Sequence, residues 1–187
     1  MKKLLVLCGG PGTGKTTIQH YLEEKYGFSR VLTHTTRPRR KGETDRKDYY
    51  FETKTSFFRN RYFEYMEYDG NFYGSSAESL ARTWQHHDNA VIVLDTKGAL
   101  AYKQKLRTKQ VSFWYIAVAD QNILGQRLLK RGEAKERAAR RLQSKEAIRD
   151  MQMPQQLRTF CEVLLNDDWG KTTAEIELFL RRDGFLK

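Results

Sequence analysis

The stretch LLVLCGGPGTGKTTI, residues 4–18, decides the fold of this chain. Gly9, Gly14, Lys15 and Thr16 complete the spacing G-x-x-x-x-G-K-[ST] of a phosphate-binding loop. The glycines let the backbone turn so that several N–H groups point at one anion, and the positive end of the following helix faces the same place. Lys15 is placed to reach a terminal phosphate, and the Thr16 hydroxyl to bind Mg²⁺. The stretch therefore predicts a nucleotide phosphate site.

The residues around this loop have the pattern that the motif requires. Residues 4–8 form a short apolar run typical of a buried strand, and residues 16–26 have helical spacing with Ile18, Leu22 and Tyr26 on one face. We expect the whole loop to line the phosphate site, namely Gly9, Gly10, Pro11, Gly12, Thr13, Gly14, Lys15, Thr16 and Thr17.

Length and composition limit the class of protein. A chain of 187 residues with 39% hydrophobic and 30% charged residues predicts one domain, or one core with insertions. No apolar run approaches the roughly 18 residues that span a bilayer, and residues 4–8 are too short for a signal peptide. Cys8 and Cys161 match no metal-ligand spacing, so we expect buried free thiols in a reducing compartment and a cytoplasmic protein.

The charge balance points to an anionic partner. The chain carries 34 Lys and Arg against 23 Asp and Glu, a net charge of +11. Nucleotide phosphates and nucleic acid both fit this charge, which does not choose between them.

Strand and helix patterns alternate over most of the chain. Apolar runs predict strands at 4–8, 30–33, 90–94, 111–118 and 162–165, and helical patterns lie at 16–26, 98–107, 121–130, 137–151 and 173–182. This alternation predicts an α/β fold with a central parallel sheet covered on both faces, and a ligand site beyond the carboxyl ends of the strands.

Residues 33–84 interrupt this alternation. They are aromatic and polar with stretches of period two, which predicts a small mixed or antiparallel module inserted into the core. We expect Phe51, Phe57, Phe58 and Phe63 to form the core of this module.

Two further features suit phosphate chemistry. The apolar strand at 90–94 is followed by Asp95, and in phosphate-loop proteins such an aspartate orients Mg²⁺ and its waters. Arg131 and Gly132 lie between two helical stretches that are rich in arginine, which suits a mobile lid over a phosphate. A solvated charged helix face is the alternative interpretation of the arginine-rich stretch.

A second constellation carries a family resemblance. The stretch THTTRPRRKGE at 33–43, followed by DYYF at 48–51, resembles the acceptor module of guanylate kinases, with their signature T-T-R-x-P-R-x-G-E-x-x-x-x-D-Y-x-F. The resemblance covers nearly the whole chain, with further matches at Glu64, GNFYGS (70–75), Arg131-Gly132, Arg141-Leu142 and Asn166-Asp167-Asp168.

This resemblance implies a P-loop three-layer fold with an inserted acceptor module and a helical lid. The implied core comprises residues 1–32, 85–125 and 150–187, the GMP-binding module residues 33–84 and the lid residues 126–149, as one contiguous structural unit. The implied reaction is ATP + GMP giving ADP + GDP by in-line, Mg²⁺-assisted phosphoryl transfer.

The resemblance also implies the roles of particular residues. Lys15, Arg37, Arg131 and Arg141 would be catalytic, Asn166 would join the loop in binding ATP, and Thr16 and, through water, Asp95 would hold Mg²⁺. The implied GMP contacts are Thr33, Arg37, Arg40, Tyr49, Glu64, Tyr73, Gly74 and Ser75. Physically, guanidiniums and phenols suit a phosphate dianion, and a carboxylate such as Glu64 accepts the N1–H and N2–H₂ donors of guanine, which adenine lacks.

The chain departs from the family pattern at several positions. Thr33 stands where the family has serine, and Val93 stands at the first position of the family's D-x-D, leaving only Asp95. The order Arg37-Pro38-Arg39-Arg40 leaves open whether Arg39 or Arg40 is the second phosphate ligand. The lid is about one residue shorter than usual, which favours Arg131 and Arg141 over Arg137 as lid ligands.

Three other functions are alternatives to a guanylate kinase. An inactive interaction module is disfavoured by the intact Lys15 and Thr16, and a kinase for another phosphorylated acceptor, a deoxynucleotide or a ribose phosphate, would not need Glu64. A nucleic-acid-binding protein is suggested by the charge alone. The expected partners are therefore ATP and GMP, without a membrane or nucleic acid, in a monomer or homodimer.

Overall fold

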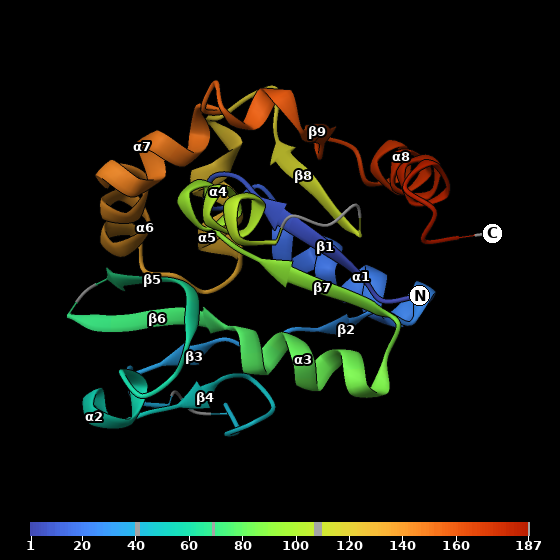
Figure 1. The fold of residues 1–187 in the computed structure, drawn as a ribbon. Helices are drawn as coiled ribbons and strands as arrows, with labels where there is room; N and C mark the ends of the chain where they lie inside the picture. Colours follow the sequence, from blue (N-terminus) through green and yellow to red (C-terminus); the bar gives the residue numbers. More distant parts are fainter. Residues whose placement is uncertain (40–41, 69, 107–109, 187) are drawn as a thin grey trace.

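The computed structural model describes residues 1–39, 42–68, 70–106 and 110–186 (Figure 1). Its strands are β1 (Lys3–Cys8), β2 (Ser29–Arg30), β3 (His34–Thr35), β4 (Tyr50–Phe51), β5 (Tyr62–Tyr68), β6 (Asn71–Ser76), β7 (Asn89–Val93), β8 (Val111–Ala117) and β9 (Cys161–Leu165). Its helices are α1 (Lys15–Tyr26), α2 (Lys54–Phe57), α3 (Ala77–His86), α4 (Thr96–Lys105), α5 (Ile123–Lys130), α6 (Lys135–Leu142), α7 (Lys145–Met151), a 3₁₀ turn η1 (Leu157–Thr159) and α8 (Trp169–Arg182).

The central sheet is parallel, with the strand order β2-β7-β1-β8-β9 in the described part of the chain. β1 lies in its middle, pairing with β7 from Lys3↔Asn89 to Leu7↔Val93 and with β8 on the other side. The predicted α/β fold is confirmed, and the loop that follows β1 leaves the carboxyl edge of the sheet, where ligands of such sheets bind.

Alternate side chains of β1 serve the two faces of this sheet, as period two requires. Leu4, Val6 and Cys8 belong to a buried cluster with residues of α3 and α4, whereas Leu5 and Leu7 belong to a cluster with residues of α1 and α8. Helices therefore cover both faces (Figure 1). Cys8 and Cys161 are buried free thiols, as predicted.

A second, mixed sheet has the order β4-β3-β6-β5 and lies below the central sheet in Figure 1. β3 pairs with β4 in parallel and with β6 antiparallel, and β5 and β6 form an antiparallel pair. This confirms the mixed module predicted from residues 33–84. Of the aromatic residues expected inside it, Phe57 is fully buried, but Phe58 is 53% exposed. Phe63 packs instead on Tyr102 of α4, with 4.6 Å between ring centroids.

Three local predictions were wrong or incomplete. The single helix predicted at 137–151 is two helices, α6 and α7, because Ser144 caps the second by accepting the Ala147 N–H at 3.1 Å. Of the strand predicted at 30–33, only Arg30 lies in a strand, since β2 ends there and the next strand, β3 of the second sheet, begins at His34. Helix α3 was not predicted; Ser76 caps it by accepting the Ser79 N–H at 3.0 Å.

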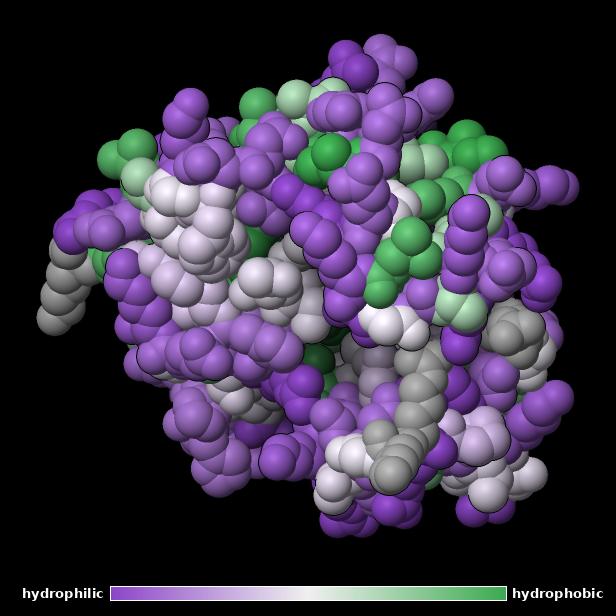
Figure 2. Space-filling view, turned by 180° about the vertical axis from the view of Figure 1, so that it is seen from behind, coloured by the Kyte–Doolittle hydropathy of each residue, from purple (hydrophilic) through white to green (hydrophobic). Residues whose placement is uncertain are grey.

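The surface agrees with a charge-rich chain. Figure 2 shows one face on which hydrophilic side chains predominate and hydrophobic ones form smaller groups between them. Within the described residues, no helix is both long and apolar enough to cross a membrane.

Candidate active site

The phosphate-binding loop is a tight turn between β1 and α1, and glycine is required at both of its ends. Gly9 has φ +129°, and a Cβ there would lie 2.3 Å from the backbone oxygen of Ile116 on β8. Gly14 has φ +98°, and a Cβ there would lie 2.1 Å from Nδ2 of the Asn166 side chain. Any other residue at these positions would have to displace a neighbour that the fold holds in place.

Lys15 begins α1 and turns back over the loop. Its Nζ donates to the carbonyl oxygens of Gly9 at 2.8 Å and Gly10 at 2.6 Å. Burial lowers the pKa of Lys15 to about 8, while the carboxylate of Asp150 opposes that shift. An arriving phosphate would favour the charged amine and offer it stronger acceptors than two carbonyls.

Asn166, which directly follows β9, holds the phosphate-binding loop in place through a hydrogen bond. Its side-chain Nδ2 donates to the Thr13 carbonyl at 2.8 Å, its Oδ1 accepts from the Thr172 hydroxyl at 3.2 Å, and the residue is buried. The structure thus gives Asn166 a loop-positioning contact. The adenine contact implied by the family resemblance stays a prediction.

The second sheet presents the predicted base-recognition residues. Glu64 on β5 pairs with Ser75 on β6, and the Ser75 hydroxyl donates to Glu64 Oε1 at 2.8 Å. Burial raises the pKa of Glu64 to about 7, with the nearby Asp95 adding to the shift and the Ser75 hydrogen bond opposing it. Gly74, which precedes Ser75 on β6, is needed because a Cβ there would lie 2.8–2.9 Å from the Tyr62 ring and Tyr65 Cβ.

Arg37 is held in place by a bidentate ion pair. Its two terminal nitrogens donate to Glu43 at 2.7 and 2.9 Å, and the side chain of Arg37 is only 11% exposed. The guanidinium also lies 5.6 Å from the Tyr49 ring centroid, and Tyr49 packs edge-on to Tyr73. This arrangement fixes one cation and two phenols on the same side of the site, a set of donors suited to a phosphate dianion.

One cavity of about 390 Å³ joins the loop to this second sheet. Its wall includes Gly9, Pro11 and Lys15 from the loop side and Thr33, Arg37, Tyr49, Glu64, Tyr73 and Gly74 from the acceptor side. The structure therefore brings together residues that the sequence separates by more than 50 positions. Ser75 is fully buried behind Glu64 and reaches the cavity only through it.

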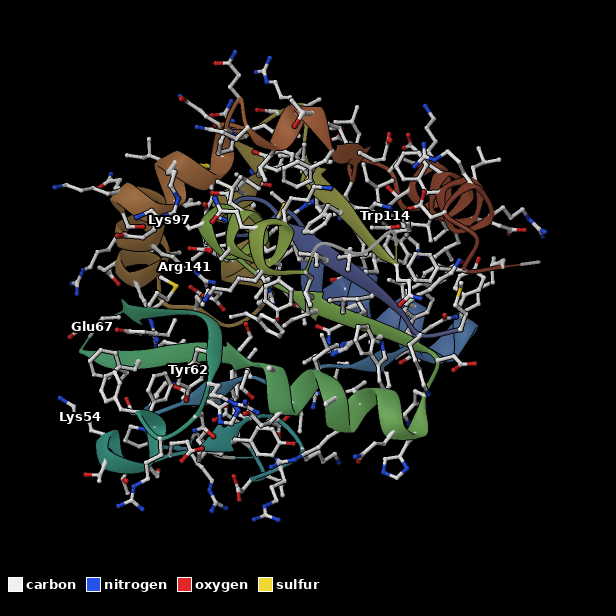
Figure 3. All side chains as sticks on the ribbon, in the orientation of Figure 1. Lys54, Tyr62, Glu67, Lys97, Trp114 and Arg141 are labelled. Atoms are coloured by element: carbon white, nitrogen blue, oxygen red, sulfur yellow. The ribbon has the colours of Figure 1, made fainter. Side chains whose placement is uncertain are left out.

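Arginines of α6 form a third part of the cavity wall, next to the loop and the second sheet. Arg137 and Arg141 line it, and Arg141 reaches from α6 toward the second sheet (Figure 3). Arg141 is held by an ion pair with Glu133 at 2.5 Å. Arg131 does not line the cavity, although its charge contributes to lowering the pKa of Lys15. The structure thus places Arg137, which the sequence disfavoured, nearer to the site than Arg131.

Arg39 and Arg40 are the two candidates for the second phosphate-binding arginine. Arg40 lies outside the residues that the structure describes. Arg39, the alternative, lies with its guanidinium 5.5 Å from the Phe51 ring centroid. The choice between them stays open.

Sequence reasoning missed an acidic group contributed by α7. Asp150 is only 6% exposed, accepts from the Thr96 hydroxyl and backbone N–H, and lines the same cavity as Lys15. Arg149 donates to Asp150 at 2.9 Å and to Asp95 at 2.6 Å. The sequence held no signal for this cluster, because an Arg-Asp pair in a charged helix is typical of a solvated surface.

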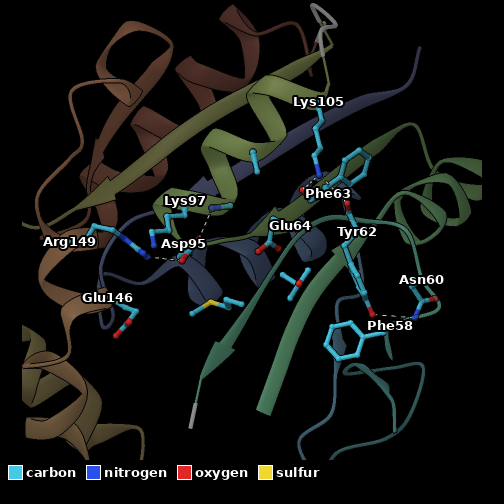
Figure 4. Close-up of a pocket in the computed structure, with 14 residues that line it drawn as sticks. Phe58, Asn60, Tyr62, Phe63, Glu64, Asp95, Lys97, Lys105, Glu146 and Arg149 are labelled. Carbon is cyan, nitrogen blue, oxygen red and sulfur yellow. Dashed lines mark hydrogen bonds and ion pairs between the residues drawn. The ribbon is translucent and has the colours of Figure 1, made fainter. Parts of the chain in front are cut away.

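A second cavity of about 550 Å³ adjoins the first between β5 and α4 (Figure 4). Glu64, Asp95 and Glu146 line both cavities, and Lys97 and Arg149 line the second. Glu64 therefore lies where the acceptor side of the site meets a charged cleft.

The residues present fit Mg²⁺ carried by a nucleotide. Thr16 lies in the first turn of α1, beside the loop, and Asp95 and Asp150 line the cavity, so hard oxygen donors surround the phosphate site. Among the described residues, no three His, Cys, Asp or Glu side chains are grouped to bind a metal directly. Both oxygens of Asp95 already accept hydrogen bonds, from Gly98 N–H and from Arg149 at 2.6 Å each.

A phosphate-binding loop at the edge of a parallel sheet, facing an arginine–tyrosine pocket across one cavity, defines a P-loop phosphotransferase. Comparison with known proteins shows to which family of phosphotransferases the chain is similar. The sequence profile of guanylate kinase matches residues 1–183. The chain is 33% identical over 181 residues to the guanylate kinase of Acinetobacter baylyi, covering 93% of this chain and 84% of that protein.

Two further relatives agree with this match. The guanylate kinase of Lactococcus lactis is 36% identical over 155 residues, covering 79% of this chain and 75% of that protein. The crystal structure of guanylate kinase from Anaplasma phagocytophilum superposes with a TM-score of 0.65 at 26% identity, covering 97% of this chain and 86% of that one. The chain belongs to the guanylate kinase family.

Proposed function

We infer that this protein transfers the γ-phosphoryl group of ATP to GMP, producing ADP and GDP. The observation that carries this function is the single cavity whose wall holds Lys15 of the phosphate-binding loop, Arg37 with its two tyrosines, and Glu64. Membership of the guanylate kinase family supports the same reaction. Phosphoryl transfer needs little covalent help, so positioning and charge neutralisation in this cavity suffice for catalysis.

The loop is the donor side of the proposed site. Its backbone N–H groups and Lys15 hold the β- and γ-phosphates of ATP, and Lys15 exchanges its two carbonyl acceptors for phosphate oxygens. Thr16 holds the Mg²⁺ that accompanies ATP, which neutralises charge on the phosphates. Asp150 is the carboxylate whose charge favours the protonated form of Lys15.

The second sheet is the acceptor side. Arg37, Tyr49 and Tyr73 hold the phosphate of GMP, with a further arginine from positions 39–40. Glu64 accepts the N1–H and N2–H₂ of guanine, and Ser75 and Thr33 complete the base site. AMP would leave the buried carboxylate of Glu64 without donors, which is costly and gives selectivity against adenine.

The arginines of α6 complete the site. Arg141 and Arg137 stabilise the charge spread over the transferring group, and Arg131 joins them when residues 126–149 close as a lid. Closure excludes water, which would otherwise hydrolyse ATP. The division into a core, a GMP-binding module at 33–84 and this lid is part of the proposal.

The proposal includes a cytoplasmic location, which the two buried free cysteines support because such thiols persist in a reducing compartment. It includes ATP and GMP as small-molecule partners and a monomer or homodimer as the assembly.

Acceptor selectivity tests this function. ADP formation from Mg²⁺-ATP is measured with GMP, dGMP, AMP, UMP, CMP and ribose 5-phosphate offered separately, for the native protein and for Lys15→Ala and Glu64→Ala. We expect turnover with GMP that both substitutions abolish or strongly reduce. Turnover with ribose 5-phosphate and not GMP would refute the assignment of Glu64 to guanine, and ATP binding without any acceptor turnover would refute the enzyme.

A further inference from the structure

A phenol lies buried behind the predicted base-recognition residues, on the core helix that packs against them. Tyr102 of α4 is fully buried, and its ring packs on Phe63 of β5 with 4.6 Å between centroids. From the end of the same helix, Lys105 donates to the backbone oxygens of Tyr62 at 3.2 Å and Phe63 at 2.6 Å (Figure 4). Helix α4 is thus fixed against β5, the strand that carries Glu64.

The hydroxyl of Tyr102 lies near the pair that Glu64 and Ser75 form. Tyr102 follows Gly98 by one helical turn on the same face of α4, and a Cβ at Gly98 would lie 3.4 Å from Glu64 Cδ. Burial raises the pKa of Tyr102, the Ser75 hydroxyl opposes that shift and the charge of Glu64 adds to it, so both residues lie close to the phenol. The Ser75 hydroxyl itself donates to Glu64 Oε1 at 2.8 Å, which leaves the Ser75 oxygen able to accept a hydrogen bond.

The Tyr102 hydroxyl has no partner at hydrogen-bonding geometry in this structure. Within the part of the chain that the structure describes, its oxygen is one of four buried side-chain oxygens that lack one. A buried hydroxyl without a partner costs free energy, because it has given up its hydrogen bonds to water. That cost is recovered only in a state in which the hydroxyl gains an acceptor, and the Ser75 oxygen is an acceptor close to it.

We propose that Tyr102 is a positioning residue for acceptor recognition, whose hydroxyl donates to the Ser75 oxygen when guanine binds to Glu64. This inference rests on the proposed function. The N–H donors of guanine hold the Glu64 carboxylate, and Ser75 with it, in one arrangement, and a small shift of β6 toward α4 then gives the phenol its acceptor. Tyr102 does not touch the base; it stabilises the arrangement of the two residues that bind it.

This role has a signature that a purely structural tyrosine lacks. Tyr102→Phe removes a hydroxyl that is unpaired before GMP binds, so the protein without GMP should lose no stability. The same substitution removes a hydrogen bond from the GMP complex, so GMP should bind more weakly. A hydroxyl that only held the core together would instead lower the stability when removed, and its loss would not distinguish GMP from ATP.

Tyr26→Phe is the matched control. Among the described residues, the phenol oxygen of Tyr26 is likewise buried without a hydrogen-bond partner. Tyr26 ends α1 and packs on the cluster at the opposite face of the central sheet from the cluster that contains Tyr102. The control therefore shares the unpaired hydroxyl with Tyr102 but is remote from Glu64 and Ser75.

Stability and substrate dependence are measured on the native protein and both variants, by urea denaturation and by initial rates with GMP and ATP varied in turn. We expect Tyr102→Phe to match or exceed the native denaturation midpoint, to raise the KM for GMP about threefold to tenfold and to leave the KM for ATP unchanged. Tyr26→Phe should leave both KM values unchanged. An unchanged KM for GMP in Tyr102→Phe would overturn the proposal, as would a midpoint below the native one, because the hydroxyl would then be paired before GMP binds.

The route through Ser75 is tested by a double-mutant cycle. Ser75→Ala keeps the Glu64 carboxylate but removes the oxygen that the phenol would use, so adding Tyr102→Phe to it should change the KM for GMP by less than about twofold. A further increase as large as that in the native background would overturn the proposal. If the native protein turned over no GMP, the proposed function would fail and this role with it. Normal GMP turnover with no effect of Tyr102→Phe would refute this role alone.

Discussion

The substitution Gly9→Ala tests the geometry of the phosphate-binding loop. Gly9 has φ +129°, a conformation essentially confined to glycine, and forcing another residue into such a region costs of order 1–3 kcal/mol. The new Cβ would also lie 2.3 Å from the carbonyl oxygen of Ile116. Ile116 pairs with Leu164 within the central sheet, so its backbone has no room to retreat. Overpacking of this kind costs about 1–3 kcal/mol more.

Gly27→Ala is the matched control. Gly27 caps α1 with φ +67°, and no atom lies within 4 Å of its added Cβ, so only the left-handed backbone costs energy, about 1–2 kcal/mol. The free energy of unfolding is measured by urea denaturation, and ATP affinity with a fluorescent analogue. We expect Gly9→Ala to lose about 1–4 kcal/mol more than the control and to lose ATP binding, which the control keeps. Equal losses of stability with ATP binding intact in both would refute the loop geometry.

Three further predictions follow from the site and the core. Burial raises the pKa of Glu64 to about 7, so the ionised fraction of Glu64 falls as the pH drops below 7. In initial-rate assays the KM for GMP should therefore rise by up to about tenfold per pH unit. A KM that stays constant from pH 5.5 to 7 would contradict this. Arg37→Lys removes a bidentate, fixed guanidinium, so the KM for GMP should rise about tenfold or more with ATP affinity unchanged, and equal effects on both substrates would argue against an acceptor role. Trp114→Ala leaves a cavity at a fully buried core position and removes the hydrogen bond from the indole N–H to Asp183. Urea denaturation should show a free energy of unfolding lower by about 3–5 kcal/mol. A decrease under about 1 kcal/mol would contradict the packing described.

The donor side was predictable because its determinants are local in sequence. The spacing of Gly9, Gly14, Lys15 and Thr16 fixes a turn between one strand and one helix, and the structure has that turn. The apolar runs gave the parallel sheet for the same reason, since each buried strand carries its own pattern.

Other features depend on contacts between distant segments. The break between α6 and α7 depends on Ser144 serving as a cap, which the helical pattern on both sides conceals. The cluster of Arg149 with Asp95 forms only when α7 packs beside the end of β7, 54 residues away in sequence. Likewise, Arg137 lines the cavity because of how α6 is oriented, which no spacing rule specified.

The central claim is that one cavity couples ATP to GMP, and product stoichiometry tests it most directly. ATP and GMP are mixed in equal amounts with Mg²⁺ and the native protein, and ADP, GDP and inorganic phosphate are resolved over time by ³¹P NMR. We expect ADP and GDP in a one-to-one ratio, with little inorganic phosphate and no ADP when GMP is left out. ADP that forms together with inorganic phosphate at the same rate with and without GMP would contradict it.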